Sequence, residues 1–262
     1  MRLLLKLVPK KSHAYMNDYH YHLQAAIYSL IREGGLPDVH EKAGYKFFCF
    51  SNIFPYGDFE QGLERNLFVS SPDPRIIGAI RRASLSTGRS EGGFFMGRLQ
   101  FEIVGVSEPF DLDLRGPEVM VSTSTPIVMR IPKSRFEEYG IKPKIDYDYV
   151  FWRDGVLLEA FLTQLRDNMV KKWRDYHVER GLTWEPIEEG QLLPPIMHYK
   201  FIRVVSKPLI LKGAKQIVIG SLWDLGFVVS DSPQANILNF SVDCGFGERN
   251  SLGFGFLNLK NK

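Results

Sequence analysis

The chain of 262 residues has a mass of 30.1 kDa, near the size at which one hydrophobic core stops growing and chains divide into domains. Hydrophobic residues make up 44% of the sequence and charged residues 24%, which are ordinary globular values and exclude disordered, collagen-like and coiled-coil proteins. The 33 Lys and Arg exceed the 30 Asp and Glu by only three charges, a surplus too small to indicate an anionic partner.

Signals for secretion, membrane insertion and metal binding are weak throughout the sequence. The opening run Met1–Val8 is too short for a secretory signal, and no stretch approaches the roughly 18 to 20 apolar residues of a membrane helix. We therefore expect a cytoplasmic protein with no membrane partner. Cys49 and Cys244 are expected to be buried reduced thiols, and the pair His20 and His22 has no Asp or Glu at ligand spacing, so no metal or other cofactor is predicted.

The first half of the chain is predicted to alternate between strands and helices. Gly34-Gly35 and Pro37 end the first helix, and Ser71 and Asp73 stand where the second should be capped. The periodicity predicts helices over 17–33 and 75–86, and strands over 1–8, 45–54, 63–69 and 99–106. The order is strand, helix, strand, strand, helix, strand, which is that of a ferredoxin-like domain.

The second half is predicted to repeat this order without a recognisable sequence repeat. The expected elements are a strand over 119–131, a long helix over 156–180, strands over 197–211 and 216–229, a short helix from 231 or 232 to about 240, and a strand over 253–259. We therefore predict an α+β fold of two tandem ferredoxin-like (RRM-like) βαββαβ domains. The N-terminal domain is placed at residues 1–123 and the C-terminal domain at 124–262.

Four glycines lie close together near the C-terminus, at Gly245, Gly247, Gly253 and Gly255. A dinucleotide-binding G-x-G-x-x-G pattern is excluded because the third glycine would fall on an asparagine, and no Gly-Lys-Ser/Thr of a phosphate-binding loop is present. Two interpretations remain. The glycines let the backbone approach a phosphate group beside Arg249, or they form a tightly packed entry to the last strand.

The spacing G-x-G-x(5)-G-x-G, as the closing motif of two ferredoxin-like domains, resembles the RAMP superfamily of CRISPR-associated proteins, and within it the Cas6 family. The resemblance covers the whole chain in length and element order. It implies a metal-independent endoribonuclease without a cofactor, whose partner is CRISPR repeat RNA. Such an enzyme cleaves CRISPR precursor RNA within its repeats through the 2′-hydroxyl, leaving a 2′,3′-cyclic phosphate and a 5′-hydroxyl.

Three residues match the catalytic positions that the resemblance implies: Tyr28 in the first helix, His40 in the loop after it, and Lys46 shortly beyond. Cleavage through the 2′-hydroxyl needs a base, an acid for the leaving oxygen and a cation near the phosphate. A histidine can serve as either base or acid near neutral pH. The sequence leaves open which of His40 and Tyr28 is the base.

Each of these residues also has a purely structural interpretation. His40 would be a solvated loop residue, and Lys46 would protect the edge of the strand that it is expected to begin. Helical periodicity places Tyr28 about 100° from the apolar stripe, so an accessible ring is expected. His13, His20 and His22 lie nearer in sequence and could also reach the site.

Positive charge is concentrated in a stretch free of Asp and Glu between residues 189 and 224. If this stretch forms a β-hairpin, its cations can follow an RNA phosphate backbone. The predicted RNA-binding cations are Lys200, Arg203, Lys207, Lys212 and Lys215, to which the glycines and Arg249 are added. A second acid-free stretch, between residues 73 and 91, carries Arg75, Arg81, Arg82 and Arg89.

Two other functions are compatible with the sequence. The first is a non-catalytic RAMP-type subunit that holds repeat RNA without cutting it. The second is a generic ferredoxin-like interaction protein. Other CRISPR-associated subunits and a second copy of the chain, forming a homodimer, are possible partners under the leading hypothesis.

Overall fold

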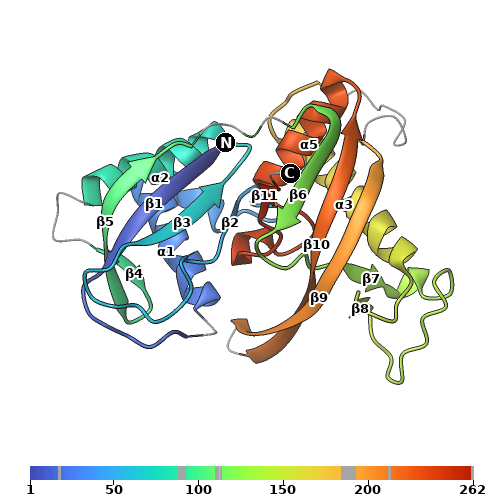
Figure 1. Ribbon diagram of the computed structural model, residues 1–262, viewed down its shortest axis with the longest axis horizontal. Helices are drawn as coiled ribbons and strands as arrows, with labels where there is room; N and C mark the ends of the chain where they lie inside the picture. The colour runs from blue at the N-terminus through green and yellow to red at the C-terminus, as the bar shows by residue number, and fades with distance from the viewer. Residues whose placement is uncertain are drawn as a thin grey trace.

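The structure is a computed structural model that describes residues 1–16, 19–87, 93–109, 112, 114–183, 193–211 and 214–260, with the backbone alone at 210, 211, 214 and 215. It forms two domains side by side, each with helices packed on one face of an antiparallel sheet (Figure 1).

The N-terminal domain contains a five-stranded sheet in the order β2-β3-β1-β5-β4. Its strands are β1 (Arg2–Pro9), β2 (Cys49–Phe50), β3 (Arg65–Ser70), β4 (Phe94–Met96) and β5 (Leu99–Ser107), and its helices are α1 (His20–Glu33) and α2 (Pro74–Thr87). Alternate residues of β1 point to the helices, so Leu3, Leu5 and Leu7 are fully buried. The short helix η1 (Pro37–Val39) follows α1.

The C-terminal domain repeats this plan with the sheet order β11-β6-β10-β9. Its strands are β6 (Gly116–Thr123), β9 (Ile196–Leu211), β10 (Ala214–Val229) and β11 (Leu257–Leu259), and its helices are α3 (Leu158–Glu179) and α5 (Ser232–Cys244). A separate hairpin of β7 (Arg130–Pro132) and β8 (Tyr149–Phe151), with the short helix η2 (Lys133–Arg135) between its strands, is inserted between β6 and α3. Another short helix, η3 (Asn250–Leu252), lies between α5 and β11. Both sheets have the ferredoxin-like order, so the predicted fold class is confirmed.

Several elements differ from the sequence prediction. The strand expected over 45–54 is reduced to Cys49–Phe50, and that expected over 253–259 is reduced to Leu257–Leu259. The apolar run over 119–131 divides into β6 and β7, because the chain turns at residues 124–126, where Pro126 has no N–H to continue a ladder. The strand β4 and the hairpin of β7 and β8 were not predicted.

The pairing of β6 bears on where the domains divide. β6 pairs with β10 and β11, so residues 116–123 belong to the second sheet. A boundary after residue 123, as predicted from the sequence, would separate β6 from its partners. We propose that the boundary lies in the segment 108–115 instead.

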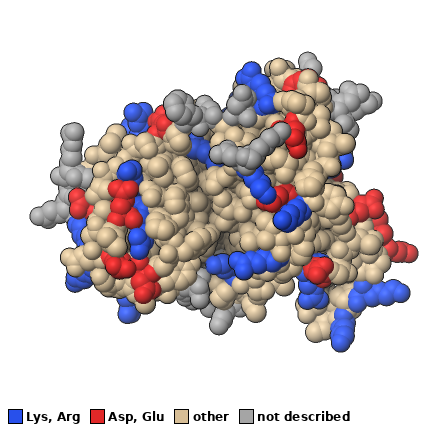
Figure 2. Space-filling view, in the orientation of Figure 1, with Lys and Arg blue, Asp and Glu red and all other residues tan. Residues whose placement is uncertain are grey.

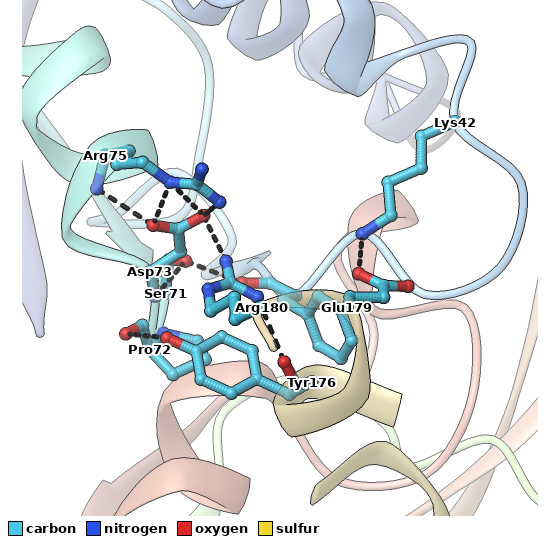
Figure 3. A network of polar contacts seen from close by, with 9 residues as sticks. Lys42, Ser71, Pro72, Asp73, Arg75, Tyr176, Glu179 and Arg180 are labelled. Atoms are coloured by element: carbon cyan, nitrogen blue, oxygen red, sulfur yellow. Dashed lines mark hydrogen bonds and ion pairs between the residues drawn. The ribbon is translucent and has the colours of Figure 1, made fainter. Parts of the chain in front are cut away.

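A polar network joins the start of α2 to the end of α3 across the domain boundary (Figure 3). The Asp73 carboxylate accepts hydrogen bonds from the Arg75 side chain and from Arg180, the residue directly after α3, while the Tyr176 hydroxyl donates to the Pro72 carbonyl oxygen at 3.0 Å. Burial raises the pKa of Asp73, but the hydrogen bonds and charges of Arg75 and Arg180 outweigh it and leave that pKa below its usual value. The network fixes the C-terminal end of α3 against the N-terminal domain.

Within the described residues, the structure has no helix that is both long and apolar enough to cross a membrane.

Candidate active site

The helix α1 and the turn after it bring Tyr28 and His40 together. Their rings meet edge to face, with centroids 4.7 Å apart and planes at 85°. Both line a pocket of about 290 Å³, together with Ala25, Ser29, Arg32, Leu36, Pro37 and Glu41. His40 is exposed to solvent, at the C-terminal end of η1. The predicted pair therefore forms one site at the surface of the N-terminal domain.

Tyr28 is less accessible than its position on the helical wheel predicts, since its side chain is only 9% exposed. The helical wheel considers the helix alone, whereas Phe48 of the same domain packs against one side of the ring and Ser251, from the C-terminal domain, lies at the hydroxyl. Burial raises the pKa of Tyr28, and hydrogen bonding with Ser251 and Gln24 opposes this only in part. The hydroxyl is therefore protonated at neutral pH and can donate a hydrogen bond or a proton.

Lys46 lies in the loop before β2 and not on a strand, so it does not protect a sheet edge. Its ammonium donates to the carbonyl oxygen of His40 at 2.9 Å and to that of Lys42. Burial lowers the pKa of Lys46, and the neighbouring charge of Lys42 lowers it further. The structure thus places all three predicted catalytic residues in one region.

The other histidines near the N-terminus are placed elsewhere. His20 is 2% exposed and stacks between Tyr19, Phe50 and Phe254. Burial lowers its pKa to about 4, assisted by the charge of Lys207, so the ring is neutral at neutral pH. His22 lies against Gly97 of the turn between β4 and β5, and the described lining of the Tyr28–His40 pocket contains neither histidine.

The glycine cluster forms a tight loop between α5 and β11 in which all four glycines have positive φ. A Cβ on Gly253 would lie 2.4 Å from the Phe50 ring, and one on Gly255 would lie 1.9 Å from the Phe246 carbonyl oxygen. A Cβ on Gly245 would lie 2.9 Å from the Cβ of Cys49. The glycines therefore allow close packing within the loop and against the N-terminal domain, as the second of the two interpretations predicted.

A buried lysine holds this loop from inside. The ammonium of Lys172 on α3 is 1% exposed and donates to the carbonyl oxygens of Gly245 and Gly247 and to Asn250 Oδ1. The Asn250 amide in turn donates to the carbonyl oxygens of Phe246 and Phe254, each at 3.0 Å. These bonds place η3, and with it Ser251, over α1.

Two of the predicted RNA-binding cations face the N-terminal domain. Arg203 and Lys207 lie on the part of β9 that approaches α1, where Lys207 acts electrostatically on His20 and Arg203 acts on Tyr56. Burial lowers the pKa of Lys207, and the charge of Arg203 adds to this. Figure 2 shows a group of Lys and Arg atoms at this place, in the hollow between the two domains.

The other predicted cations of the hairpin are Lys200, Lys212 and Lys215. Lys200 is exposed but pairs in register with Asp224, a carboxylate already bonded to Lys260. Lys212 and the side chain of Lys215 lie outside the described residues.

The described arginines of the second acid-free stretch, between residues 73 and 91, bond to other groups of the protein. Arg75 pairs with Asp73, Arg81 pairs with Glu108, and Arg82 donates to the carbonyl oxygen of Gly34. Arg89 lies outside the described residues. These partners favour a structural role for the stretch over an RNA-binding one.

No cluster of three or more His, Cys, Asp or Glu side chains placed to hold a metal ion occurs in the part of the chain that the structure describes. Both cysteines are buried and free, as predicted.

Comparison with known proteins decides the family. The family described as CRISPR associated protein Cas6, C-terminal, matches residues 108–259, more than half of the chain. The chain belongs to this Cas6 family. The match covers the glycine loop and the long hairpin of β9 and β10, so the family suggested by the glycine spacing is confirmed.

Similar proteins extend over the full length of the chain. A CRISPR-associated endoribonuclease Cas6 2 from Methanocaldococcus jannaschii is 29% identical, over 98% of this chain and 99% of the relative. A CRISPR-associated endoribonuclease Cas6 from Haloferax mediterranei is 27% identical, over 100% of this chain and 94% of the relative. Among solved structures, a RAMP protein binding different RNA substrates matches with a TM-score of 0.70 at 23% identity, over 100% of both chains. The structural likeness independently supports the Cas6 and RAMP fold.

Sequence reasoning missed the residues that fix the glycine loop of the C-terminal domain against α1 of the N-terminal domain. They are chiefly Lys172, Asn250 and Ser251. One signal was available for Lys172. It continues the apolar stripe of α3 formed by Phe161, Leu165 and Met169, a position where a lysine is buried only if its ammonium finds several acceptors. Asn250 and Ser251 carried no comparable signal, because Lys172, which bonds to Asn250, and Tyr28, which bonds to Ser251, are distant in sequence.

Proposed function

We propose that this protein is an endoribonuclease that processes CRISPR precursor RNA, cleaving within the repeats without a metal ion. The observation that carries the proposal is the grouping of Tyr28, His40 and Lys46 at one place on a Cas6-family chain. A base, a hydroxyl donor and a cation are the groups that cleavage through a 2′-hydroxyl requires. The curated relatives are themselves CRISPR-associated endoribonucleases, which supports the same reaction class here.

In the proposed reaction, His40 removes the proton from the 2′-hydroxyl, whose oxygen attacks the adjacent phosphorus. The bond from phosphorus to the 5′-oxygen breaks, and that oxygen takes a proton, which leaves a 2′,3′-cyclic phosphate and a 5′-hydroxyl. Tyr28 suits the donor role and not the base role, because burial raises the pKa of its hydroxyl. Lys46, held at the backbone of His40, stabilises the negative charge that develops on the phosphate.

The proposed RNA path runs from this site into the hollow between the domains. Arg203 and Lys207 on β9 supply positive charge there, and Tyr56 is an exposed aromatic ring against which a base can stack. The glycine loop contributes to this path through Arg249 and through Ser251 at the Tyr28 hydroxyl. Lys200, Lys212 and Lys215 would extend the basic surface along the hairpin.

The proposal is tested by incubating the full-length protein with labelled CRISPR repeat RNA in the presence of EDTA. We expect cleavage at one position, with a cyclic phosphate and a 5′-hydroxyl at the new ends, and no cleavage when the attacking 2′-hydroxyl is replaced by hydrogen. His40→Ala should reduce the single-turnover rate by about 10²- to 10⁴-fold, the usual contribution of one proton-transfer group. His13→Ala, at an exposed histidine of the same domain, is the matched control and should cleave normally.

Three outcomes would contradict the proposal in different ways. Cleavage that EDTA abolishes would refute metal independence, and full activity in His40→Ala would refute the assigned site. RNA that is bound but remains intact would instead identify a non-catalytic RAMP-type subunit. If the protein binds no RNA even at low salt, the remaining hypothesis is that it is a generic ferredoxin-like interaction protein.

A further inference from the structure

A second pocket lies beside the proposed active site, between α3 and the glycine loop. It has a volume of about 320 Å³ and is open to solvent. Tyr45, Met129, Arg130, Gln164, Asp167, Asn168, Lys171, Glu248 and Arg249 line it. Tyr45 directly precedes Lys46, so the pocket adjoins the loop that carries the proposed catalytic lysine.

Hydrogen-bonding groups in this pocket are left without partners. Among the described residues, Gln164 Nε2, Asn168 Oδ1 and Arg249 Nε are buried and form no hydrogen bond. Gln164 and Asn168 are one turn apart on α3, so their amides lie on the same face of the helix. A buried polar group without a partner is costly in the free protein, so the three groups indicate a ligand that offers one donor and two acceptors.

The balance of charge in the pocket favours an anionic ligand. Both carboxylates are engaged, Glu248 with Arg130 and Asp167 with Arg135. Lys171 and Arg249 form no salt bridge with any residue that the structure describes, and both border the cavity. Two cations are thus available to an anionic ligand.

Arg249 occupies a backbone conformation that suits glycine better than arginine. Its φ is 59° and its ψ is 31°, in the left-handed region, where a Cβ crowds the following carbonyl oxygen. A glycine at this position would make the same turn at lower cost. The arginine is therefore explained by what its side chain does in the pocket and not by the turn itself.

Resting on the proposed function, we propose that this pocket binds one unpaired purine nucleotide of the RNA and so contributes to the choice of cleavage position. The Gln164 amide and the Arg249 guanidinium donate to acceptors on the edge of the base, and Asn168 Oδ1 accepts from its N–H. The ring of Tyr45 offers a face for stacking, and Lys171 lies where a phosphate can reach it. Adenine presents this pattern, because its N6 amino donor lies between the two acceptors N1 and N7, and a two-ring purine offers the Tyr45 ring a larger face for stacking than a pyrimidine does.

The test uses the full-length protein and repeat RNA made non-cleavable by a single 2′-deoxy nucleotide, with each unpaired purine replaced in turn by a pyrimidine. We expect one purine whose replacement weakens binding by the wild-type protein by about tenfold to a hundredfold, the range of a good amide–base pairing. In the double variant Gln164→Leu/Asn168→Leu, the same replacement should have little effect, while the other positions keep theirs. Free adenosine and guanosine 5′-monophosphates at millimolar concentration show whether an isolated nucleotide can occupy the pocket without RNA.

Arg249→Gly tests whether the Arg249 side chain contributes to RNA binding without destabilising the fold. It should leave the melting temperature unchanged or raised, because glycine prefers this φ, while RNA affinity falls by about tenfold. Arg166→Gln, at an exposed arginine of α3, is the control for lost positive charge and is compared with Arg249→Gln. The control should weaken binding of all RNAs slightly and equally.

Several results would overturn the proposal. They are a double variant that keeps the purine preference, a uniform loss of affinity for every substituted RNA, and competition by free nucleotides in the double variant equal to that in the wild type. The assay measures binding, so it stands even if the wild-type protein does not cut RNA. Failure of the nuclease proposal is thereby distinguished from failure of the pocket proposal, whereas a protein that binds no RNA would refute both.

Discussion

Replacing Lys172 by methionine should destabilise the protein strongly, although the two side chains are similar in length and shape. The ammonium makes three hydrogen bonds to buried acceptors of the glycine loop, and methionine can make none of them. Hydrogen bonds from a charged group contribute about 1.5 to 3 kcal/mol each. Against this stands the cost of burying the ammonium, which is several kcal/mol and which also lowers the pKa of Lys172.

The net effect follows from what the substitution leaves behind. Two carbonyl oxygens and the Asn250 Oδ1 would remain buried without a donor. Each buried acceptor left unsatisfied costs about 1 to 3 kcal/mol, or about 3 to 9 kcal/mol for the three, and the variant recovers part of this because it no longer buries an ammonium. That is a large part of the roughly 5 to 15 kcal/mol by which domains are stable. We therefore expect a loss of about 3 to 5 kcal/mol in the free energy of unfolding.

Urea denaturation followed by circular dichroism measures this loss as a lower midpoint at unchanged slope. Lys171→Met, at the exposed neighbouring lysine, is the control and should change stability by less than about 0.5 kcal/mol. A loss of less than about 1 kcal/mol in Lys172→Met would refute the reasoning, since it would mean that water or a rearranged loop satisfies the carbonyl oxygens.

Three further predictions concern acid stability, loop packing and RNA binding. The pKa of His20 is about 4 in the folded protein and near 6.5 unfolded, so the unfolded chain binds more protons between these values and stability falls as pH falls through that window. His20→Phe should remove roughly 3 kcal/mol of this pH dependence in denaturation curves, and an unchanged dependence would contradict it. Gly255→Ala should cost at least about 2 kcal/mol because its Cβ meets backbone, whereas Gly78→Ala, within α2, should stabilise by about 0.5 to 1 kcal/mol; equal effects in thermal melts would refute this. Lys207→Gln should reduce the slope of log affinity against log salt by about 0.7 if it contacts a phosphate of single-stranded RNA, and an unchanged slope would exclude that contact.

The regular elements were predictable where one periodicity extends over many residues. The helices α1, α2 and α3 and the long strands β9 and β10 lie within a few residues of their expected positions, because each presents one apolar face to its own domain. The loop before β2 was mistaken for strand because its aromatic residues are buried by the other domain. Phe47, for example, contacts Tyr176 and Phe240.

The candidate site was also predictable only in part from the sequence. The order and types of Tyr28, His40 and Lys46 were visible in the sequence, since the chemistry of RNA cleavage restricts the residue types and the glycine spacing indicates the family. Their proximity was not visible, because it depends on η1 folding His40 back onto α1 and on the loop carrying Lys46 to the backbone of His40.

By itself, the sequence determined the two ferredoxin-like halves and the family, because short-range periodicity and motif spacing are properties of neighbouring residues. The resemblance to that family then supplied the candidate catalytic residues. Only the tertiary structure decided that Tyr28 is buried, that the four glycines serve close packing, and that Lys172 anchors their loop. These properties depend on atoms that residues far apart in the chain bring within contact distance. The pocket at Arg249 likewise exists only where α3 meets the glycine loop.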